Sequence, residues 1–215
     1  MSLKINEIFY GIQGESSYAG RPCVFVRLTG CNLRCSYCDT QYAYSEGEEM
    51  QIDEIIGRVS SYRCSLVEVT GGEPLIQEET PNLIHRLLEE GFEVLLETNG
   101  SRDISKIDGR CIRIIDIKCP SSGEEKRSDP ENLKRLREKD EIKFVIGDRT
   151  DYEYAKNILD TINLDSPVKN TIHFSNVFGQ MHPRTLAQWI LEDNLNVRLH
   201  VQLHKFIWGP EQRGV

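Results

Sequence analysis

The chain has 215 residues and a formal charge of −8, with 26 Lys and Arg residues against 34 Asp and Glu residues. This length suits one domain, so a single domain is expected over residues 1–215. Because nucleic-acid affinity comes largely from clustered Lys and Arg, the acidic balance argues against an extended phosphate-binding surface. The sequence has no apolar run of about 18 residues and no basic, apolar leader, so it predicts a cytoplasmic protein that binds neither nucleic acid nor membrane.

Short apolar runs alternate with helical patterns along the chain, after the first residues have passed into a polar-interrupted strand. The pattern predicts strands at 23–28, 66–70, 93–98, 113–117, 141–146, 171–174 and 197–203. It predicts helices at 52–59, 81–90, 130–139, 151–162 and 183–194. Such alternation is typical of an α/β fold with a parallel sheet. Residues 99–111 lack a convincing long helix, and a full eight-fold barrel takes about 250 residues, so an abbreviated, open (βα)-repeat partial barrel is predicted.

Three cysteines form a C-x3-C-x2-C run, Cys31, Cys35 and Cys38, directly after the first predicted parallel strand. Three thiolates can hold a [4Fe–4S] cluster and leave one iron without a protein ligand. Structural zinc would need a fourth ligand, and the sequence has no second C-x2-C. Disulfides are disfavoured by the odd cysteine count and the lack of an export signal. The other four cysteines are isolated and are interpreted as non-ligands: Cys23, Cys64, Cys111 and Cys119.

Motifs on either side of the cysteines resemble those of the 7-carboxy-7-deazaguanine synthase family of the radical S-adenosylmethionine superfamily. The sequence reads FYGIQGE at 9–15, TGGEP at 70–74 and QLHK at 202–205. The cysteine run and GGEP are superfamily signals, whereas FYGIQGE and LHK point to this one family. The resemblance covers nearly the whole chain and implies the radical S-adenosylmethionine type of partial barrel. It also implies a lyase that converts 6-carboxy-5,6,7,8-tetrahydropterin to 7-carboxy-7-deazaguanine with loss of ammonia, in queuosine and 7-deazapurine biosynthesis.

The resemblance implies that S-adenosylmethionine completes the cluster and that no catalytic side chain is needed beyond the cluster and this cofactor. Gly72 would contact its methionine amino group. The other residues implied in cofactor binding are Asp116, Ile117, Lys118, Ser175 and Asn176. Many relatives have proline where this chain has Asn176. All these residues follow or end predicted parallel strands, where loops of such folds converge on one rim.

Thr40 stands two residues after the last cysteine, where the resemblance implies a Mg²⁺ site shared with substrate. Magnesium prefers oxygen ligands and keeps several waters, so one hydroxyl together with substrate oxygens is chemically reasonable. A threonine in a loop is more often a local turn residue, so the metal assignment depends on the resemblance.

The implied substrate carries a carboxylate, and arginine matches a carboxylate with two parallel hydrogen bonds. Arg27, near the end of the first predicted parallel strand, is assigned this contact, and a surface ion pair is the alternative. The pterin edge is assigned mainly to backbone groups of Ile12, Gln13 and Gly14, and to the hydroxyl of Thr70. Further assignments are Glu15 and Glu97, either of which could instead be a structural ion pair. His204 and Lys205 follow the last predicted strand, where the histidine could be a packed residue as easily as a contact. The resemblance implies a substrate contact from a terminal carboxylate a few residues after this pair, and three alternatives stand for this longer chain: the contact is lost, replaced by Pro210 or supplied by Val215.

The resemblance further implies a homodimer and a flavodoxin-like or ferredoxin-like reductant. One alternative is a glycyl-radical-enzyme activase, which shares the cysteine run and GGEP but acts on a protein backbone. The FYGIQGE opening and Arg27 favour a small substrate instead. An iron–sulfur scaffold or electron carrier would require a fourth cysteine ligand.

Overall fold

The computed structural model describes residues 1–165 and 169–215, and a single nine-stranded sheet runs through them. The strands are β1 (Ser2–Ile12), β2 (Pro22–Leu28), β3 (Glu48–Gln51), β4 (Leu66–Gly71), β5 (Glu93–Thr98), β6 (Ile112–Ile117), β7 (Glu141–Ile146), β8 (Thr171–Asn176) and β9 (Arg198–His200). The α-helices are α1 (Ile52–Ser61), α2 (Thr80–Glu89), α3 (Glu131–Lys134), α4 (Arg149–Asp165), α5 (Pro183–Glu192) and α6 (Leu203–Ile207).

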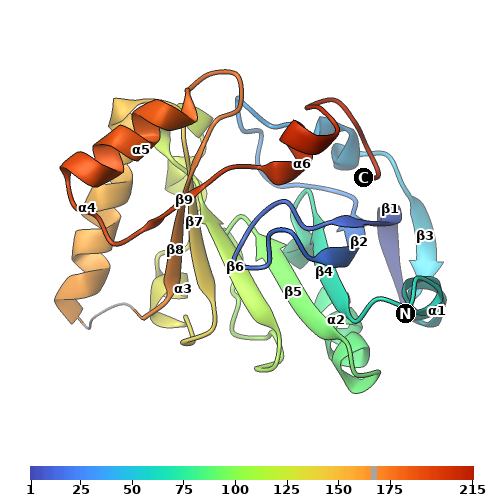
Figure 1. The fold of residues 1–215 in the computed structure, drawn as a ribbon. Coiled ribbons are helices and arrows are strands. Elements are labelled where there is room, and N and C mark those ends of the chain that lie inside the picture. The colour runs from blue at the N-terminus through green and yellow to red at the C-terminus, as the bar shows by residue number, and fades with distance from the viewer. Residues whose placement is uncertain (166–168) are drawn as a thin grey trace.

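The sheet order is β3-β1-β2-β4-β5-β6-β7-β8-β9. Strands β2 and β4 to β9 are parallel, whereas β1 is antiparallel to both of its neighbours, β2 and β3. In the described part of the chain β3 and β9 are edge strands that do not pair with each other, so the barrel is open. The predicted α/β partial barrel is confirmed. The parallel strands bring their carboxyl ends to one rim, shown at the upper side of the sheet in Figure 1.

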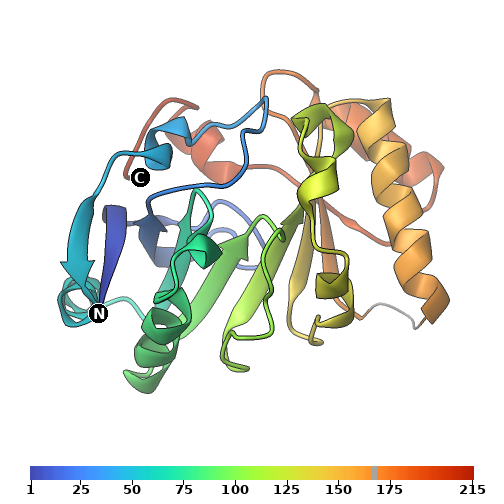
Figure 2. The same ribbon diagram turned by 180° about the vertical axis from the view of Figure 1, so that it is seen from behind.

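Helices α1, α2, α4 and α5 cover the outer face of the sheet (Figure 2). Helix α1 shows why, because its buried residues fall at helical spacing and form one apolar stripe: Ile52, Ile55, Ile56 and Val59. This stripe packs in one core cluster with strands β1, β2 and β4, while α4 and α5 pack with β6, β7 and β8 in a second cluster. The inner face carries a third, smaller cluster that includes Cys23, Phe25 and Leu95, and Phe25 also lines the cavity on that face.

The first six predicted parallel strands are confirmed with small shifts at their ends, and so are four of the five predicted helices. The predicted helix 130–139 is wrong, because only Glu131–Lys134 is helical. The reason is a fully buried arginine on β6. The Arg113 guanidinium donates a hydrogen bond to the Arg135 carbonyl oxygen at 2.8 Å. Asp140, the ion-pair partner of Arg113, accepts a hydrogen bond from the Arg137 N–H at 2.7 Å. The Arg135 carbonyl and the Arg137 N–H, which would continue the helix, instead form hydrogen bonds with the buried Arg113–Asp140 pair.

The predicted strand 197–203 is also too long, because β9 ends at His200 and α6 begins at Leu203. Beyond His200 the chain leaves the sheet edge for the loop between β1 and β2. The Leu203 N–H donates to the Gly14 carbonyl at 3.1 Å, and Gln202 Nε2 donates to Glu15 Oε1 at 2.5 Å. Strand β3 and helix α6 were not predicted.

No helix in residues 1–165 or 169–215 has the length and apolar character needed to cross a membrane.

Candidate active site

Loops at the carboxyl ends of the parallel strands enclose a cavity of about 830 Å³. The cysteine loop, the Gly71–Gly72 turn, Asn99 and Lys118 line it from successive strands. The β1–β2 loop and residues 210–215 also line it. The expected convergence of these loops is therefore confirmed.

Cys31, Cys35 and Cys38 all line this cavity and are half-buried, free thiols. Burial raises the pKa of Cys31, and it raises the pKa of Cys35 to about 11. Because iron is bound by the thiolate form, cluster binding at these two residues releases protons. The Leu33 N–H points at Cys31 Sγ from 3.4 Å, the kind of donor that tunes an iron–sulfur cluster. The donor set, three thiols on one short loop, fits the cluster.

The glycine turn after β4 packs directly on the cysteine loop. A Cβ at Gly72 would lie 2.2 Å from the Gly30 carbonyl oxygen, so only glycine fits without a backbone shift. The neighbouring Glu73 is fully buried and holds the turn, accepting hydrogen bonds from the N–H groups of Leu75 at 3.0 Å and Asn99 at 2.7 Å. The turn thus fixes two rim loops with respect to the cysteines.

Asp116 and Lys118, at the end of β6, form an ion pair of 2.8 Å beside the cavity. In the described structure Asp116 Oδ1 and the Tyr37 hydroxyl are buried without hydrogen-bond partners. Both residues line the cavity, so a bound polar ligand would satisfy them. This is the surrounding expected for a cofactor with several hydroxyl and amino groups.

The remaining residues assigned to cofactor binding are buried at strand ends and do not line the cavity: Ile117, Ser175 and Asn176. Asn176 Nδ2 donates to the Met181 carbonyl at 2.9 Å and so holds the turn that follows β8. Val177, next in the chain, does line the cavity. The contacts of these three residues with cofactor stay predictions.

Arg27 lines the cavity with its terminal nitrogens uncommitted. Its Nε donates to Glu7 Oε1 at 2.7 Å, and the Tyr42 hydroxyl donates to the same oxygen at 3.0 Å. Among the described residues nothing bonds to Nη1 or Nη2. The guanidinium is therefore anchored on one side and free to bind a carboxylate on the other.

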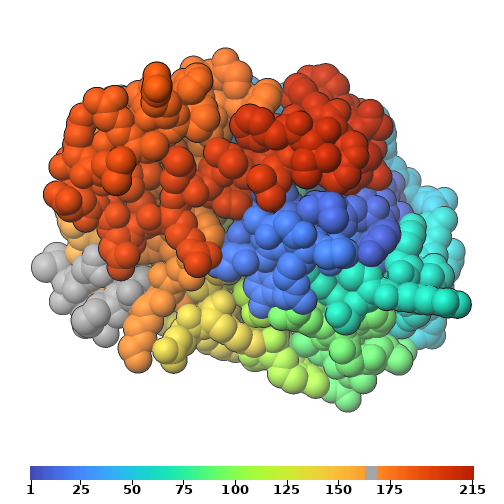
Figure 3. All heavy atoms as spheres, viewed as in Figure 1, coloured from blue at the N-terminus to red at the C-terminus, as the bar shows by residue number. Residues whose placement is uncertain are grey.

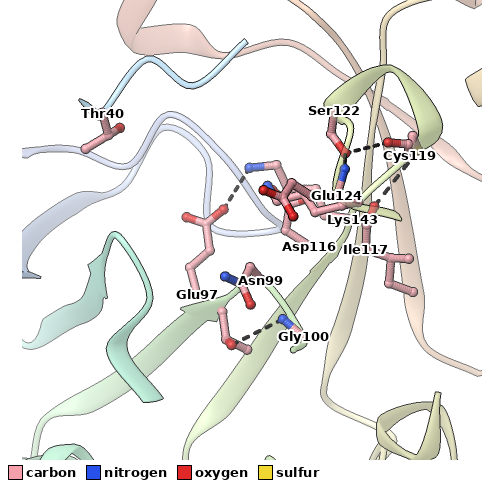
Figure 4. Close-up of polar contacts among 12 residues, drawn as sticks. Thr40, Glu97, Asn99, Gly100, Asp116, Ile117, Cys119, Ser122, Glu124 and Lys143 are labelled. Atoms are coloured by element: carbon pink, nitrogen blue, oxygen red, sulfur yellow. Dashed lines mark hydrogen bonds and ion pairs between the residues drawn. The ribbon is translucent and has the colours of Figure 1, made fainter. Parts of the chain in front are cut away.

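Lys143 on β7 was missed, although a lysine inside the apolar run EIKFVI is a visible signal. Its Nζ contacts Glu15 and lies 2.7 Å from Glu97 Oε1, and Figure 4 shows Glu97 and Lys143 directed at one another. Burial opposes ionisation of Glu15, but Lys143 outweighs it and holds the pKa of that carboxyl below its usual range. Burial raises the pKa of Glu97. Both acids contribute to the cavity wall, as expected, and both are ion-paired.

Gln13 lies in the loop after β1 and buries its side chain against Glu68, to which its Nε2 donates a hydrogen bond. Its backbone N–H and C=O already pair with Arg21 and Gly20, both at 2.8 Å. A substrate contact through the Gln13 backbone therefore stays a prediction. Glu68, a buried acid inside β4, was not anticipated. Ile12, Gly14 and Thr70 line the cavity as expected.

Thr40 lines the cavity at the end of the cysteine loop, apart from the Glu97–Lys143 pair (Figure 4). Its hydroxyl donates to Asp39 Oδ1 at 2.9 Å, and Lys205 lies 2.5 Å from the other oxygen of Asp39. The Thr40 hydroxyl and the Asp39 carboxylate thus lie next to each other at the end of the cysteine loop. His204 packs against Gly14, where a Cβ would come within 2.2 Å of the imidazole Nδ1.

Residues 210–215, which include Pro210 and Val215, fold back over β1 and line the cavity. The Arg213 guanidinium lies 3.6 Å from the centre of the Tyr42 ring. Figure 3 shows these last residues lying against the first strands on the surface of the molecule.

Known proteins are similar to this chain in sequence. The family model for the radical SAM superfamily matches residues 25–117. The 7-carboxy-7-deazaguanine synthase of Koribacter versatilis is 46% identical, over 99% of this chain and 100% of that protein. The synthase of the same name from Chlorobaculum tepidum is 48% identical, over 99% and 97%.

The chain belongs to the 7-carboxy-7-deazaguanine synthase family. Its fold resembles the crystal structure of QueE from Escherichia coli with a TM-score of 0.78 at 24% identity, over 94% of each chain. As a radical S-adenosylmethionine enzyme of this family it uses a [4Fe–4S] cluster and S-adenosylmethionine, which agrees with the three thiols on its rim.

Proposed function

We propose that the protein is a lyase that converts 6-carboxy-5,6,7,8-tetrahydropterin to 7-carboxy-7-deazaguanine with loss of ammonia. One observation carries this proposal: the cavity that holds the three-cysteine loop also holds Arg27 with its terminal nitrogens free. Full-length similarity to curated synthases of that name supports it. The activase alternative is not favoured, since a residue placed for a small carboxylate has no use in cleaving a hydrogen from a protein backbone.

When bound, the cluster and S-adenosylmethionine supply the radical that starts the reaction. The chain's own residues position the substrate. Arg27 lies near the end of β2, and Cys31 follows it by only four positions, so a carboxylate on Arg27 holds its carbon on the cysteine-loop side of the cavity. Enclosure by the rim loops and residues 210–215 limits water around the reacting carbon.

Further roles are proposed for residues around the same cavity. Gly72, Asp116 and Lys118 line it where S-adenosylmethionine would reach from the cluster. Ile117, Ser175 and Asn176 would support the same cofactor from the strand ends. A magnesium ion would take the Thr40 hydroxyl and substrate oxygens as ligands. The Asp39 carboxylate, which pairs with Lys205, lies beside Thr40.

We also propose that the chain acts as one cytoplasmic domain, in a homodimer reduced by a flavodoxin-like or ferredoxin-like protein. The single sheet through β1 to β9 supports one domain. All seven cysteines are free thiols, which supports a reducing compartment.

The decisive test is an anaerobic turnover assay. The protein is reconstituted with iron and sulfide and mixed with S-adenosylmethionine, dithionite and the tetrahydropterin, and the deazaguanine is sought by mass. Cys35→Ala is expected to lose both cluster and product, whereas Cys64→Ser, a half-buried cysteine outside the cavity, should keep both. Wild-type protein with a full cluster that cleaves S-adenosylmethionine but makes no deazaguanine would overturn the proposed substrate.

A further inference from the structure

Glu68 differs from its acidic neighbours in having no cation of its own. Glu15 and Glu97 both pair with Lys143. Glu68 forms no salt bridge in the described part of the chain, and only the neutral Gln13 amide donates to it, at Oε2. Its side chain lines the cavity although the residue is just 4% exposed. Oε1 has no donor among the described residues, and it is not one of their fully buried polar atoms without a partner. It is therefore open to the cavity, where a donor of a ligand can reach it.

The sheet register places Glu68 one layer below Arg27. Strands β2 and β4 pair Phe25 with Glu68 and Arg27 with Thr70, and all four residues line the cavity. Adjacent strands lie about 4.8 Å apart and two residues rise about 6.6 Å, so the backbones of Arg27 and Glu68 are separated by roughly 8 Å. Arg27 is on the side of the cysteine loop, and Glu68 is on the side away from it.

The proposed substrate has complementary groups at its two ends. One end carries the carboxylate. The other is a 2-amino-4-oxopyrimidine, whose ring N–H and exocyclic amino group form two parallel donors. An ionised carboxyl group accepts such a donor pair in the same way that it accepts two N–H groups of arginine. Burial favours the protonated form of Glu68, and a ligand that brings this donor pair favours loss of that proton. When the substrate carboxylate binds Arg27, the long axis of the bicyclic ring can run from Arg27 towards Glu68. The aminopyrimidine edge then lies next to Glu68.

We propose that Glu68 is a specificity-determining residue that accepts hydrogen bonds from the aminopyrimidine edge of the substrate. This inference rests on the proposed function, since it takes the carboxylate-bearing pterin as the ligand. Gln13 has a supporting part, because its amide donates to Oε2 and fixes the orientation of the carboxyl group. Each carboxyl oxygen still has a lone pair for a donor of the ligand.

The test compares two unreactive probes, pterin-6-carboxylate and its analogue in which a carbonyl oxygen replaces the 2-amino group. Binding is measured by probe fluorescence on the cluster-loaded protein. Wild type is expected to prefer the amino probe, and Glu68→Gln to lose about ten- to a hundredfold of that preference, the value of a hydrogen bond to a buried acid. Glu68→Asp keeps the carboxyl but withdraws it by one methylene, and should lose the preference as well.

Gln13→Ala is the matched control, because it removes the Gln13 amide and leaves the Glu68 carboxyl. If Glu68 acts on the ligand, Gln13→Ala weakens both probes alike and keeps the preference. Unchanged preference in Glu68→Gln, with thermal unfolding showing a folded protein, would overturn the inference. Failure of the proposed function gives a different result. Wild type then makes no deazaguanine and binds the two probes with equal affinity.

Discussion

Arg27 shows how one guanidinium can be fixed and available at the same time. Its Nε is held by Glu7, and the Tyr42 hydroxyl holds the same Glu7 oxygen, so the plane of the fork is set before a ligand arrives. Such preorganisation lowers the entropy cost of binding. The sequence predicted the residue from the chemistry of its ligand. It could not predict Glu7 and Tyr42, because their contact depends on how β1 and the cysteine loop pack.

Arg27→Lys is expected to raise KM for the tetrahydropterin about tenfold or more, since lysine keeps the charge but cannot form two parallel bonds. Iron content and S-adenosylmethionine binding should not change. The measurement is steady-state turnover together with calorimetry. Arg21→Lys is the control, as Arg21 pairs with Glu93 outside the cavity. Equal KM values for wild type and Arg27→Lys would show that Arg27 does not bind the carboxylate.

Thr40→Val keeps the shape of the side chain and deletes the oxygen, so it should reduce the stimulation of turnover by Mg²⁺ without changing iron content. A titration with chelator and Mg²⁺ measures this. Ser36→Ala is the matched control in the same loop. The Ser36 hydroxyl donates a hydrogen bond to the Ser121 carbonyl at 2.6 Å, and Ser36 is not assigned to the metal. If wild type and Thr40→Val respond alike to Mg²⁺, the metal is not bound by Thr40.

Strands β2 and β4 to β8 were predictable because their apolar runs are short, β-branched and separated by helical patterns. Helix α3 and the end of β9 were not, because distant groups override the local pattern there. The Arg113 side chain donates a hydrogen bond to the Arg135 carbonyl, and the Gly14 carbonyl accepts one from the Leu203 N–H. Lys143 and Glu68 were missed for a similar reason, since only the folded sheet shows that they face a cavity.

The contact between the β1–β2 loop and α6 leads to a prediction for Gly14. A Cβ there would overlap the His204 ring, so Gly14→Ala should push the loop away from α6 and weaken the Leu203–Gly14 hydrogen bond. We expect a loss of about 2 kcal/mol, or about 4–8 °C in Tm for a chain of this size. Thermal unfolding measures it. In α1, Gly57→Ala meets open space and should stabilise the protein by about 0.5–1 kcal/mol. A neutral Gly14→Ala would show that the loop yields freely.

Three acids, Glu15, Glu68 and Glu97, lie near one lysine, Lys143, at the cavity, so the stability of the whole molecule should depend on pH. Burial, with Glu97 and Glu15 nearby and Lys143 opposing them, raises the pKa of Glu68 well above its usual range. The folded protein then binds this proton more tightly than the unfolded chain. The resulting stability is fully present below the ordinary pKa of glutamate and is lost as pH rises through the folded value.

Glu68→Gln cannot ionise, so its unfolding free energy should exceed that of wild type increasingly from pH 4.5 to pH 8. The gain is about 1.4 kcal/mol for each unit by which the pKa is raised. Urea unfolding of both proteins at several pH values gives the comparison. Parallel stability curves across this range would contradict the raised pKa.

The open barrel is closed on one side by segments far apart in the chain. Arg198 bonds to Ser17, Gln202 to Glu15, and Lys205 to Asp39, the last pair 166 positions apart. At synthesis rates of about 5–20 residues per second, Lys205 is added roughly 10–30 s after the cysteine loop. For that time the three thiols belong to a nascent chain that lacks one wall of their cavity. Lasting burial of a cluster therefore has to follow the arrival of the C-terminal segment.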